Sequence, residues 1–167
     1  MRQWIRTLTL AALATLPAAC SGPPHEPKLV RAFSASDKPI TESGVTADDG
    51  GWKIERQAPG PVPLFEVPNP GVEYTTLTYR ARLKARDITG KAYLEMWVRV
   101  PGRGEFFSRG LEHPVTGTSD WVSLEIPFFL SERGLKPDLV KLNVAFEGGG
   151  GTVWIKDVQL LHTPLDG

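Results

Sequence analysis

The feature that most constrains the fold of this chain is a two-residue alternation of apolar and polar side chains. It is clearest in GKAYLEMWVRV (90–100), where every second residue from Ala92 to Val100 is apolar. Successive side chains of a β-strand point to opposite faces of a sheet, so this pattern predicts a strand with one buried face. The other face would present Tyr93, Glu95, Trp97 and Arg99. These residues either form a ligand platform or pack under a part of the chain that the alternation does not identify.

Similar short segments recur along the chain, separated by Gly, Pro, Asn and Asp. We expect strands at 29–33, 51–55, 63–67, 74–84, 90–100, near 106, and at 121–126, 139–147 and 152–161. In the segment 121–126 the pattern turns Val122, Leu124 and Ile126 inward. The run Gly148–Gly151 predicts a hairpin or a loose loop.

No segment has a helical period over more than two turns, and one-sided alternation favours antiparallel sheets. About seven to nine short strands joined by turns are typical of a β-sandwich or small barrel. A length of 167 residues suits one domain. The sequence therefore predicts an all-β, single-domain, antiparallel β-sandwich.

The first 19 residues are typical of a secretory signal. Arg2 and Arg6 give a basic start, the run 7–16 is mostly apolar, and small residues precede Cys20. The apolar run is shorter than the roughly 20 residues that a membrane-spanning helix needs. We therefore predict a signal peptide at 1–19, a Pro-rich tether at 20–28 and the sandwich domain at 29–167.

Cys20 is the only cysteine of the chain. LPAAC (16–20) resembles a bacterial lipobox, although Pro17 stands where that motif usually has Leu. The resemblance implies that Cys20 is acylated, which would anchor the protein to a membrane of the cell envelope. Ser21 in place of Asp implies the outer membrane if the source is Gram-negative. The alternative is a soluble secreted protein cleaved near Ala19, in which the unpaired thiol would be a liability.

The charges exclude one class of partner. The chain has 19 basic and 19 acidic residues and no block of either sign, so nucleic acid is not expected as a ligand.

Four stretches together resemble jelly-roll carbohydrate-binding modules and related galactose-binding-like domains. They are YTTLTYRARLKA (74–85), KAYLEMWVRV (91–100), TSDWVSLEIPF (118–128) and GTVWIKDVQLL (151–161). The last stretch matches a closing pattern of such domains at Gly151, Val153, Trp154, Ile155, Asp157, Val158 and Leu160. The resemblance covers about residues 62–161 and implies a jelly roll that binds saccharide on its concave sheet.

The resemblance also implies a structural calcium ion in many relatives, with Asp157 matching a residue that holds it in some of them. Lys156 stands where such relatives carry a second Asp, which argues against calcium here. Asp48 and Asp49 could supply further oxygen ligands, but Asp-Asp-Gly-Gly is equally typical of a turn. We therefore expect no cofactor.

Saccharide recognition needs flat aromatic faces and polar groups on a rigid sheet. Residues 93, 95, 97 and 99 meet this need on one strand. Arg80 and Asn143 would extend the same surface if their strands are neighbours. The predicted ligand-binding residues are Arg80, Tyr93, Glu95, Trp97, Arg99 and Asn143. The alternative is that these side chains form only ordinary cross-strand pairs.

Catalytic signals are weak. The three histidines, at 25, 113 and 162, are scattered, no Gly-x-Ser-x-Gly motif occurs, and carboxylate pairs such as Glu95 with Glu125 or Glu147 are not specific. The sequence thus predicts a membrane-anchored, non-catalytic binding module for saccharide or another cell-envelope component. The alternative is a structural or protein-interaction lipoprotein with no sugar ligand.

Overall fold

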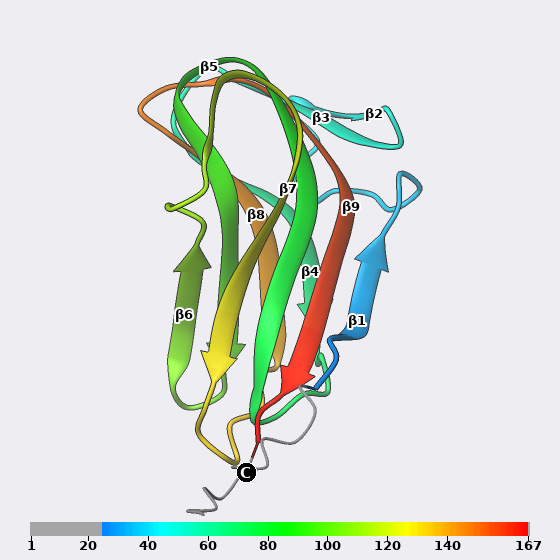
Figure 1. Cartoon of the computed structure of the whole chain (residues 1–167), viewed down its shortest axis with the longest axis vertical. Coiled ribbons are helices and arrows are strands. Elements are labelled where there is room, and N and C mark those ends of the chain that lie inside the picture. The colour runs from blue at the N-terminus through cyan, green and yellow to red at the C-terminus, as the bar shows by residue number, and fades with distance from the viewer. Residues whose placement is uncertain (1–24, 167) are drawn as a thin grey trace, which may run out of the picture.

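The computed structural model describes residues 25–166, which form nine β-strands and no helix (Figure 1). The strands are β1 (Lys28–Phe33), β2 (Val45–Asp48), β3 (Gly51–Arg56), β4 (Gly60–Pro68), β5 (Thr75–Val100), β6 (Gly104–Arg109), β7 (Val115–Leu130), β8 (Leu139–Glu147) and β9 (Gly151–Pro164). Within these residues no helix is long and apolar enough to cross a membrane. The predicted signal peptide and Cys20 lie outside the described residues.

The strands form an antiparallel β-sandwich because β5 takes part in both layers. Residues 75–86 of β5 pair with β7 and β9, whereas residues 91–100 pair with β6 and β8. The first layer continues from β9 to β1 and β3, with β2 beyond β3, and β4 completes the second layer beside β8. The predicted all-β sandwich is confirmed.

The two strands predicted at 74–84 and 90–100 are one bent strand of 26 residues. Asp87 and Gly90 mark the bend, with left-handed φ angles of 53° and 82°. Asp and Gly adopt this conformation more readily than other residues. The bend carries β5 from the first layer to the second, so the outer faces of its two halves belong to different layers.

The core lies between the layers, and the inward set predicted for 92–100 is confirmed. Ala92, Leu94, Met96 and Val98 are at most 1% exposed, and Val100 is 3% exposed. Of the inward set predicted for 121–126, Ile126 is buried and Leu124 packs against the core. Val122 pairs with the buried Leu83 and so faces the same side, but it is 38% exposed. It is left uncovered because, among the described strands, β7 pairs only with β5.

Gly148–Gly151 connects β8 in the second layer to β9 in the first. It is therefore a crossover and not a hairpin, since β8 and β9 do not pair. A side chain at Gly150 would collide with the carbonyl oxygen of Arg56, and a Cβ at Gly149 would lie 2.6 Å from the carbonyl oxygen of Thr89. The Thr89 amide donates a hydrogen bond to the Gly150 carbonyl at 2.8 Å. The close approach of three backbones explains the run of glycines.

Strand β2 was not predicted, but the turn at Asp48–Gly51 is confirmed. Asp48 pairs with Gly51 across the β2–β3 hairpin. Asp49 and Gly50 have φ angles of 49° and 76°, as a two-residue type I′ turn requires.

Candidate ligand-binding groove

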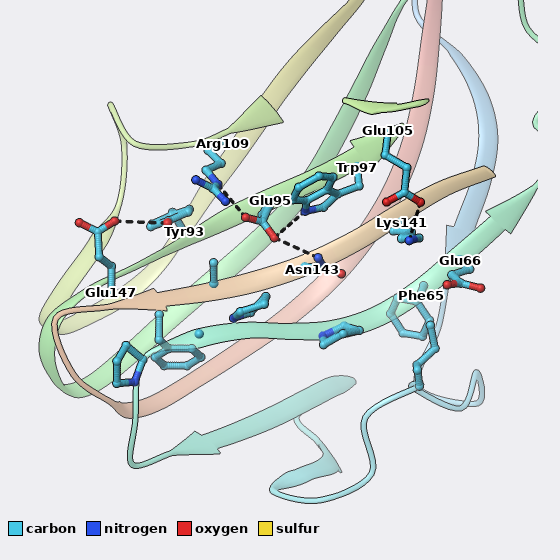
Figure 2. Close-up of a pocket in the computed structure, with 17 residues that line it drawn as sticks. Phe65, Glu66, Tyr93, Glu95, Trp97, Glu105, Arg109, Lys141, Asn143 and Glu147 are labelled. Atoms are coloured by element: carbon cyan, nitrogen blue, oxygen red, sulfur yellow. Dashed lines mark hydrogen bonds and ion pairs between the residues drawn. The ribbon is translucent and has the colours of Figure 1, made fainter. Parts of the chain in front are cut away.

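A groove of about 580 Å³ lies on the outer face of the second layer (Figure 2). Its floor comes from alternate residues of β5 and β8, and β6 borders one side. Prolines of β4 and Ile40 from the β1–β2 connection border the other side. The residues that line it are Ile40, Pro59, Gly60, Pro61, Pro63, Phe65, Glu66, Tyr93, Glu95, Trp97, Glu105, Arg109, Lys141, Asn143, Ala145, Phe146 and Glu147.

Glu95 is the centre of a hydrogen-bond network that joins three strands (Figure 2). Its Oε1 accepts hydrogen bonds from Trp97 Nε1 at 2.9 Å and Asn143 Nδ2 at 3.1 Å. Its Oε2 accepts one from Arg109 Nε at 2.7 Å. Since Glu95 is only 3% exposed and Asn143 5%, this network holds the floor of the groove in one arrangement.

Glu95 remains ionised in this setting. Burial acts to raise the pKa of its carboxyl, but the hydrogen bonds from Trp97, Asn143 and Arg109, with the charge of Arg109, outweigh burial and hold the pKa below its usual value. An ionised carboxylate accepts hydrogen bonds only. The amide of Asn143 must therefore turn its nitrogen toward Glu95, as it does.

The Trp97 ring is fixed at its nitrogen end by Glu95 and beside its face by β6. Its centroid lies 5.1 Å from that of Phe107, with the rings tilted by 48°. The Arg109 guanidinium lies 4.4 Å from the Phe107 centroid. Trp97 is partly exposed and Phe107 is 52% exposed, so the two rings form an accessible aromatic platform, held in place by a buried carboxylate.

Tyr93 is buried, although the alternation places it on the outer face of the sheet. It is 5% exposed, and its hydroxyl donates to Glu147 Oε2 at 3.3 Å. Glu147 also pairs with Lys91 at 3.1 Å. Burial and the Glu147 charge both raise the pKa of Tyr93, so the hydroxyl stays protonated. The outward set of 93–99 is thus partly packed under its own cross-strand neighbours and partly open to the groove.

Solved structures with this architecture are known, although no family model and no curated protein matches the chain. The CBM22-1 xylan-binding domain from Paenibacillus barcinonensis Xyn10C superposes with a TM-score of 0.53 at 10% identity, covering 85% of this chain and 99% of that domain. The chain has the β-sandwich fold of carbohydrate-binding modules. A second example is a family 16 carbohydrate-binding module, with a TM-score of 0.51 at 10% identity over 76% of this chain and 92% of the other.

The same fold occurs inside a larger enzyme. An arabinose-bound α-L-arabinofuranosidase, MgGH51, matches 86% of this chain with a TM-score of 0.51 at 12% identity, but the match spans only 27% of that chain. At these identities the likeness establishes the carbohydrate-binding-module fold and nothing about the ligand.

Two of the predicted ligand-binding residues lie outside the groove. Arg99 follows Trp97 on the outer face but is held by Asp138, at 2.8 Å from Nε and 3.1 Å from the second guanidinium nitrogen. Arg80 lies in the first layer and pairs with Glu125 at 2.9 Å. The sequence-based assumption that Arg80 shares a surface with Tyr93 is wrong, because the β5 bend separates them. The structure brings together Tyr93, Glu95, Trp97 and Asn143.

Asp157, the predicted calcium residue, lies at a bulge of β9 with a φ of 54°. Its nearest charged partner is the Arg82 guanidinium at 3.8 Å, and Asp48 accepts a hydrogen bond from Trp154 Nε1 at 2.9 Å. Within residues 25–166 no group of three His, Cys, Asp or Glu side chains gathers as metal ligands would. Asp49 also has cations beside it, because the ammonium groups of Lys84 and Lys156 lie 3.9 and 3.7 Å from its carboxylate.

The first layer has a second aromatic surface, which is covered by cations. The Lys84 ammonium lies 5.1 Å from the Trp121 centroid and 4.7 Å from the Trp154 centroid. Lys156 lies 4.1 Å from the Trp121 centroid, and Arg86 lies 5.1 Å from that of Trp154. Such contacts stabilise the outer face of a sheet.

The six residues predicted to bind ligand did not include Phe107, Arg109, Lys141 and Glu105. Phe107 and Arg109 alternate on β6 and stand opposite Trp97 and Glu95. Lys141 donates to Glu105 at 2.7 Å across the groove. The available signal was the i, i+2 spacing of Phe107 and Arg109 in GEFFSR, but its use requires knowing that β6 pairs with β5.

Proposed function

We propose that this protein is a non-catalytic carbohydrate-binding module that a lipid on Cys20 holds at a membrane of the cell envelope. The observation that carries the binding proposal is the fixed Trp97 platform. Its ring is partly exposed in a groove, and its nitrogen is held by the buried Glu95 carboxylate. A flat ring held in one orientation suits the apolar face of a sugar ring. One of the similar structures is a xylan-binding domain, which supports the same ligand class.

The groove also offers polar groups for sugar hydroxyls. Arg109 uses Nε for Glu95, and within residues 25–166 its two terminal nitrogens donate no hydrogen bond to the protein. Because Glu95 and Phe107 fix the guanidinium, these free donors are preorganised beside the Trp97 ring. A hydroxyl of a sugar stacked on Trp97 would accept a hydrogen bond from them.

The charges of the groove favour an uncharged saccharide. The lining carboxylates outnumber the lining cations, and an added uronic acid carboxylate would be repelled. The carboxylates are Glu66, Glu95, Glu105 and Glu147, and the cations are Arg109 and Lys141. We therefore expect neutral glycans to bind more tightly than uronic acid polymers.

The carboxylates of the groove support a role without catalysis. General acid catalysis needs a carboxyl with a raised pKa, whereas the pKa of Glu95 is lowered. Glu125, considered as its partner, lies in the other layer and pairs with Arg80. Glu147 is held by Tyr93 and Lys91.

A glycan-binding screen of the full chain carrying Cys20→Ser tests the binding proposal. We expect Trp97→Ala to lower affinity for the bound glycan by about tenfold to a hundredfold, because stacking and desolvation at one ring contribute roughly 1.5–3 kcal/mol. Trp121→Ala, in the first layer, is the matched control and should retain binding. Absence of any glycan ligand would favour the structural or protein-interaction lipoprotein instead.

Membrane anchoring is tested separately by washing the membranes of cells that express the chain with sodium carbonate, which removes proteins held only by surface contact. We expect the wild type to stay with the washed membranes and Cys20→Ser to be released. If Cys20→Ser also resists the wash, the acylation proposal is wrong.

A further inference from the structure

Exposed aromatic residues gather at one end of the sandwich, away from the groove. Phe129 is 65% exposed and Phe106 is 45% exposed. Both line an apolar hollow of about 290 Å³, together with Val100, Phe128, Leu130 and Leu135. We call this the apolar hollow. Soluble proteins seldom leave two neighbouring phenylalanines this open, and such patches mark interaction sites.

The described chain begins at the same end of the molecule as the apolar hollow (Figure 1). Phe129 of β7 pairs with Thr76 of β5, which pairs with Thr163 of β9. The residue before Thr163 on β9 is His162, which pairs with Lys28 at the start of β1. Three strand spacings of about 4.8 Å separate β7 from β1, so Phe129 and the start of β1 lie about 14 Å apart across the sheet.

Side-chain contacts connect the beginning of the described chain to the loop that borders the apolar hollow. His25 Nε2 lies 2.8 Å from the Asp166 carboxylate. The Tyr74 hydroxyl donates to the Asp166 carbonyl at 3.2 Å. The Arg133 guanidinium stacks 4.2 Å from the Tyr74 centroid, and Leu135 of the same loop lines the hollow.

Basic side chains surround this end. Arg103 lines the hollow and pairs with Glu132 at 2.7 Å, and Lys136 pairs with Glu73 at 3.3 Å. Arg133 has no ion pair within residues 25–166. Exposed aromatic rings bordered by Arg and Lys are the composition expected of a surface that meets lipid headgroups.

The chain length between Cys20 and β1 limits how far this end could lie from a bilayer. Lys28 is eight residues after Cys20. Eight extended residues span at most about 29 Å. An acyl group on Cys20 would therefore hold the end that carries the apolar hollow close to the membrane, whatever path the tether takes.

We propose that the apolar hollow is a membrane-contact surface. Phe106 and Phe129 enter the interfacial region of the bilayer, and Arg103 and Arg133 face anionic headgroups. This inference rests on the proposed anchoring for its choice of a lipid partner, and it does not depend on saccharide binding. The groove lies on the outer face of the second layer, so the domain can contact the membrane and keep the groove open.

Vesicle flotation of the full chain carrying Cys20→Ser tests the proposal without a lipid anchor. The vesicles contain phosphatidylethanolamine and phosphatidylglycerol. The test variant adds Phe106→Ser and Phe129→Ser, and the matched control adds Leu111→Ser and Val122→Ser, which are 47% and 38% exposed elsewhere on the surface. Residues 1–19 are the same in all three proteins, so their own affinity for lipid cancels in the comparison.

We expect the double Phe variant to bind the vesicles at least about tenfold more weakly than its parent, because each ring loses apolar burial. The control should stay within about twofold of the parent. Equal loss in both variants, or no loss in the Phe variant, would overturn the proposal, as would a parent that does not bind vesicles. Thermal unfolding followed by circular dichroism checks each variant, and Phe129→Asn alone replaces the double variant if that one unfolds early.

These experiments distinguish the membrane-contact proposal from the proposals of Cys20 acylation and saccharide binding. Failure of a carbonate wash to release Cys20→Ser from cell membranes would refute acylation, and the flotation comparison would still test the apolar hollow. A negative glycan screen would refute saccharide binding and leave the flotation result unaffected.

Discussion

Replacing Glu95 by Gln should destabilise the protein more than its small change in shape suggests. Gln keeps an oxygen that can accept from Trp97 Nε1 and Asn143 Nδ2. It removes the charge and turns an amide nitrogen toward Arg109, whose Nε now lies 2.7 Å from a carboxylate oxygen. The substitution therefore breaks a charge-assisted hydrogen bond at a position where the carboxylate side chain is only 4% exposed.

The magnitude follows from the burial of each partner. Breaking a fully buried ion pair costs about 3–5 kcal/mol. The Arg109 side chain is 37% exposed and can recover hydration, which reduces the loss. We expect Glu95→Gln to lower the free energy of unfolding by about 2–3 kcal/mol. Glu95→Leu should cost more, because three donors then lose their acceptor.

The assay is urea unfolding at neutral pH followed by tryptophan fluorescence. Arg99→Met, which breaks the more exposed pair with Asp138, is the control and should cost less. In the folded protein the pKa of Glu95 lies below its ordinary value of 4.5. The stability that the Glu95 carboxylate contributes is therefore complete above pH 4.5 and is lost as the pH falls through the pKa of the folded state. The difference between Glu95→Gln and the wild type should therefore shrink in acid. A substitution cost no larger than that of Arg99→Met would refute the account of Glu95 as the organising residue.

Three further predictions concern other parts of the fold. The Tyr79 hydroxyl is buried and has no hydrogen-bond partner among residues 25–166, so Tyr79→Phe should leave the free energy of unfolding unchanged or raise it by about 1 kcal/mol; a loss above about 1 kcal/mol in urea unfolding would contradict this. Gly150→Ala should lower the melting temperature by several degrees, because its Cβ would meet the Arg56 carbonyl; calorimetry of the variant beside the wild type measures the difference, and an unchanged melting temperature would contradict this. Arg80→Ala should leave glycan affinity unchanged, since Arg80 lies in the first layer, and a loss in the glycan screen would place the ligand elsewhere.

The alternation of apolar and polar residues predicted the buried side chains correctly where the inward face of a strand is fully covered by the opposite layer. Residues 92–100 are such a case, since they are covered by the core on one side. Val122 is the counterexample: it follows the same alternation but lies on a strand with a neighbour on one side only. Local pattern cannot distinguish these cases, because exposure depends on which strands are paired.

The same reason limited the prediction of the site. Tyr93, Glu95 and Trp97 were identified from one strand, and Asn143 was added correctly from β8, its neighbour. Arg80 was added wrongly because the turn from first to second layer depends on the backbone at Asp87 and Gly90. The apolar–polar alternation stops near 84 and resumes at 90, and nothing in it indicates that the chain changes layers in between.

The residues that make the Trp97 platform rigid were not predicted for a related reason. Phe107 and Arg109 belong to β6, which lies opposite Trp97 and Glu95 only because the turn at 101–103 returns the chain antiparallel to β5. A carboxylate between two aromatic residues in one strand gives no sign that a distant Arg and Asn will satisfy it. The fold therefore followed from pattern, and so did the clustering of Tyr93, Glu95, Trp97 and Asn143, whereas the network that organises them required the structure.

The most direct test of the proposed binding site is an NMR titration that follows the tryptophan indole N–H signals while a neutral oligosaccharide from the glycan screen is added. The Trp97 Nε1–H donates to Glu95 beneath the proposed sugar position, so we predict that its signal shifts in proportion to bound ligand. The signals of Trp121 and Trp154, on the other layer, should stay in place. A titration in which Trp121 or Trp154 shifts while Trp97 does not would contradict the groove as the saccharide site.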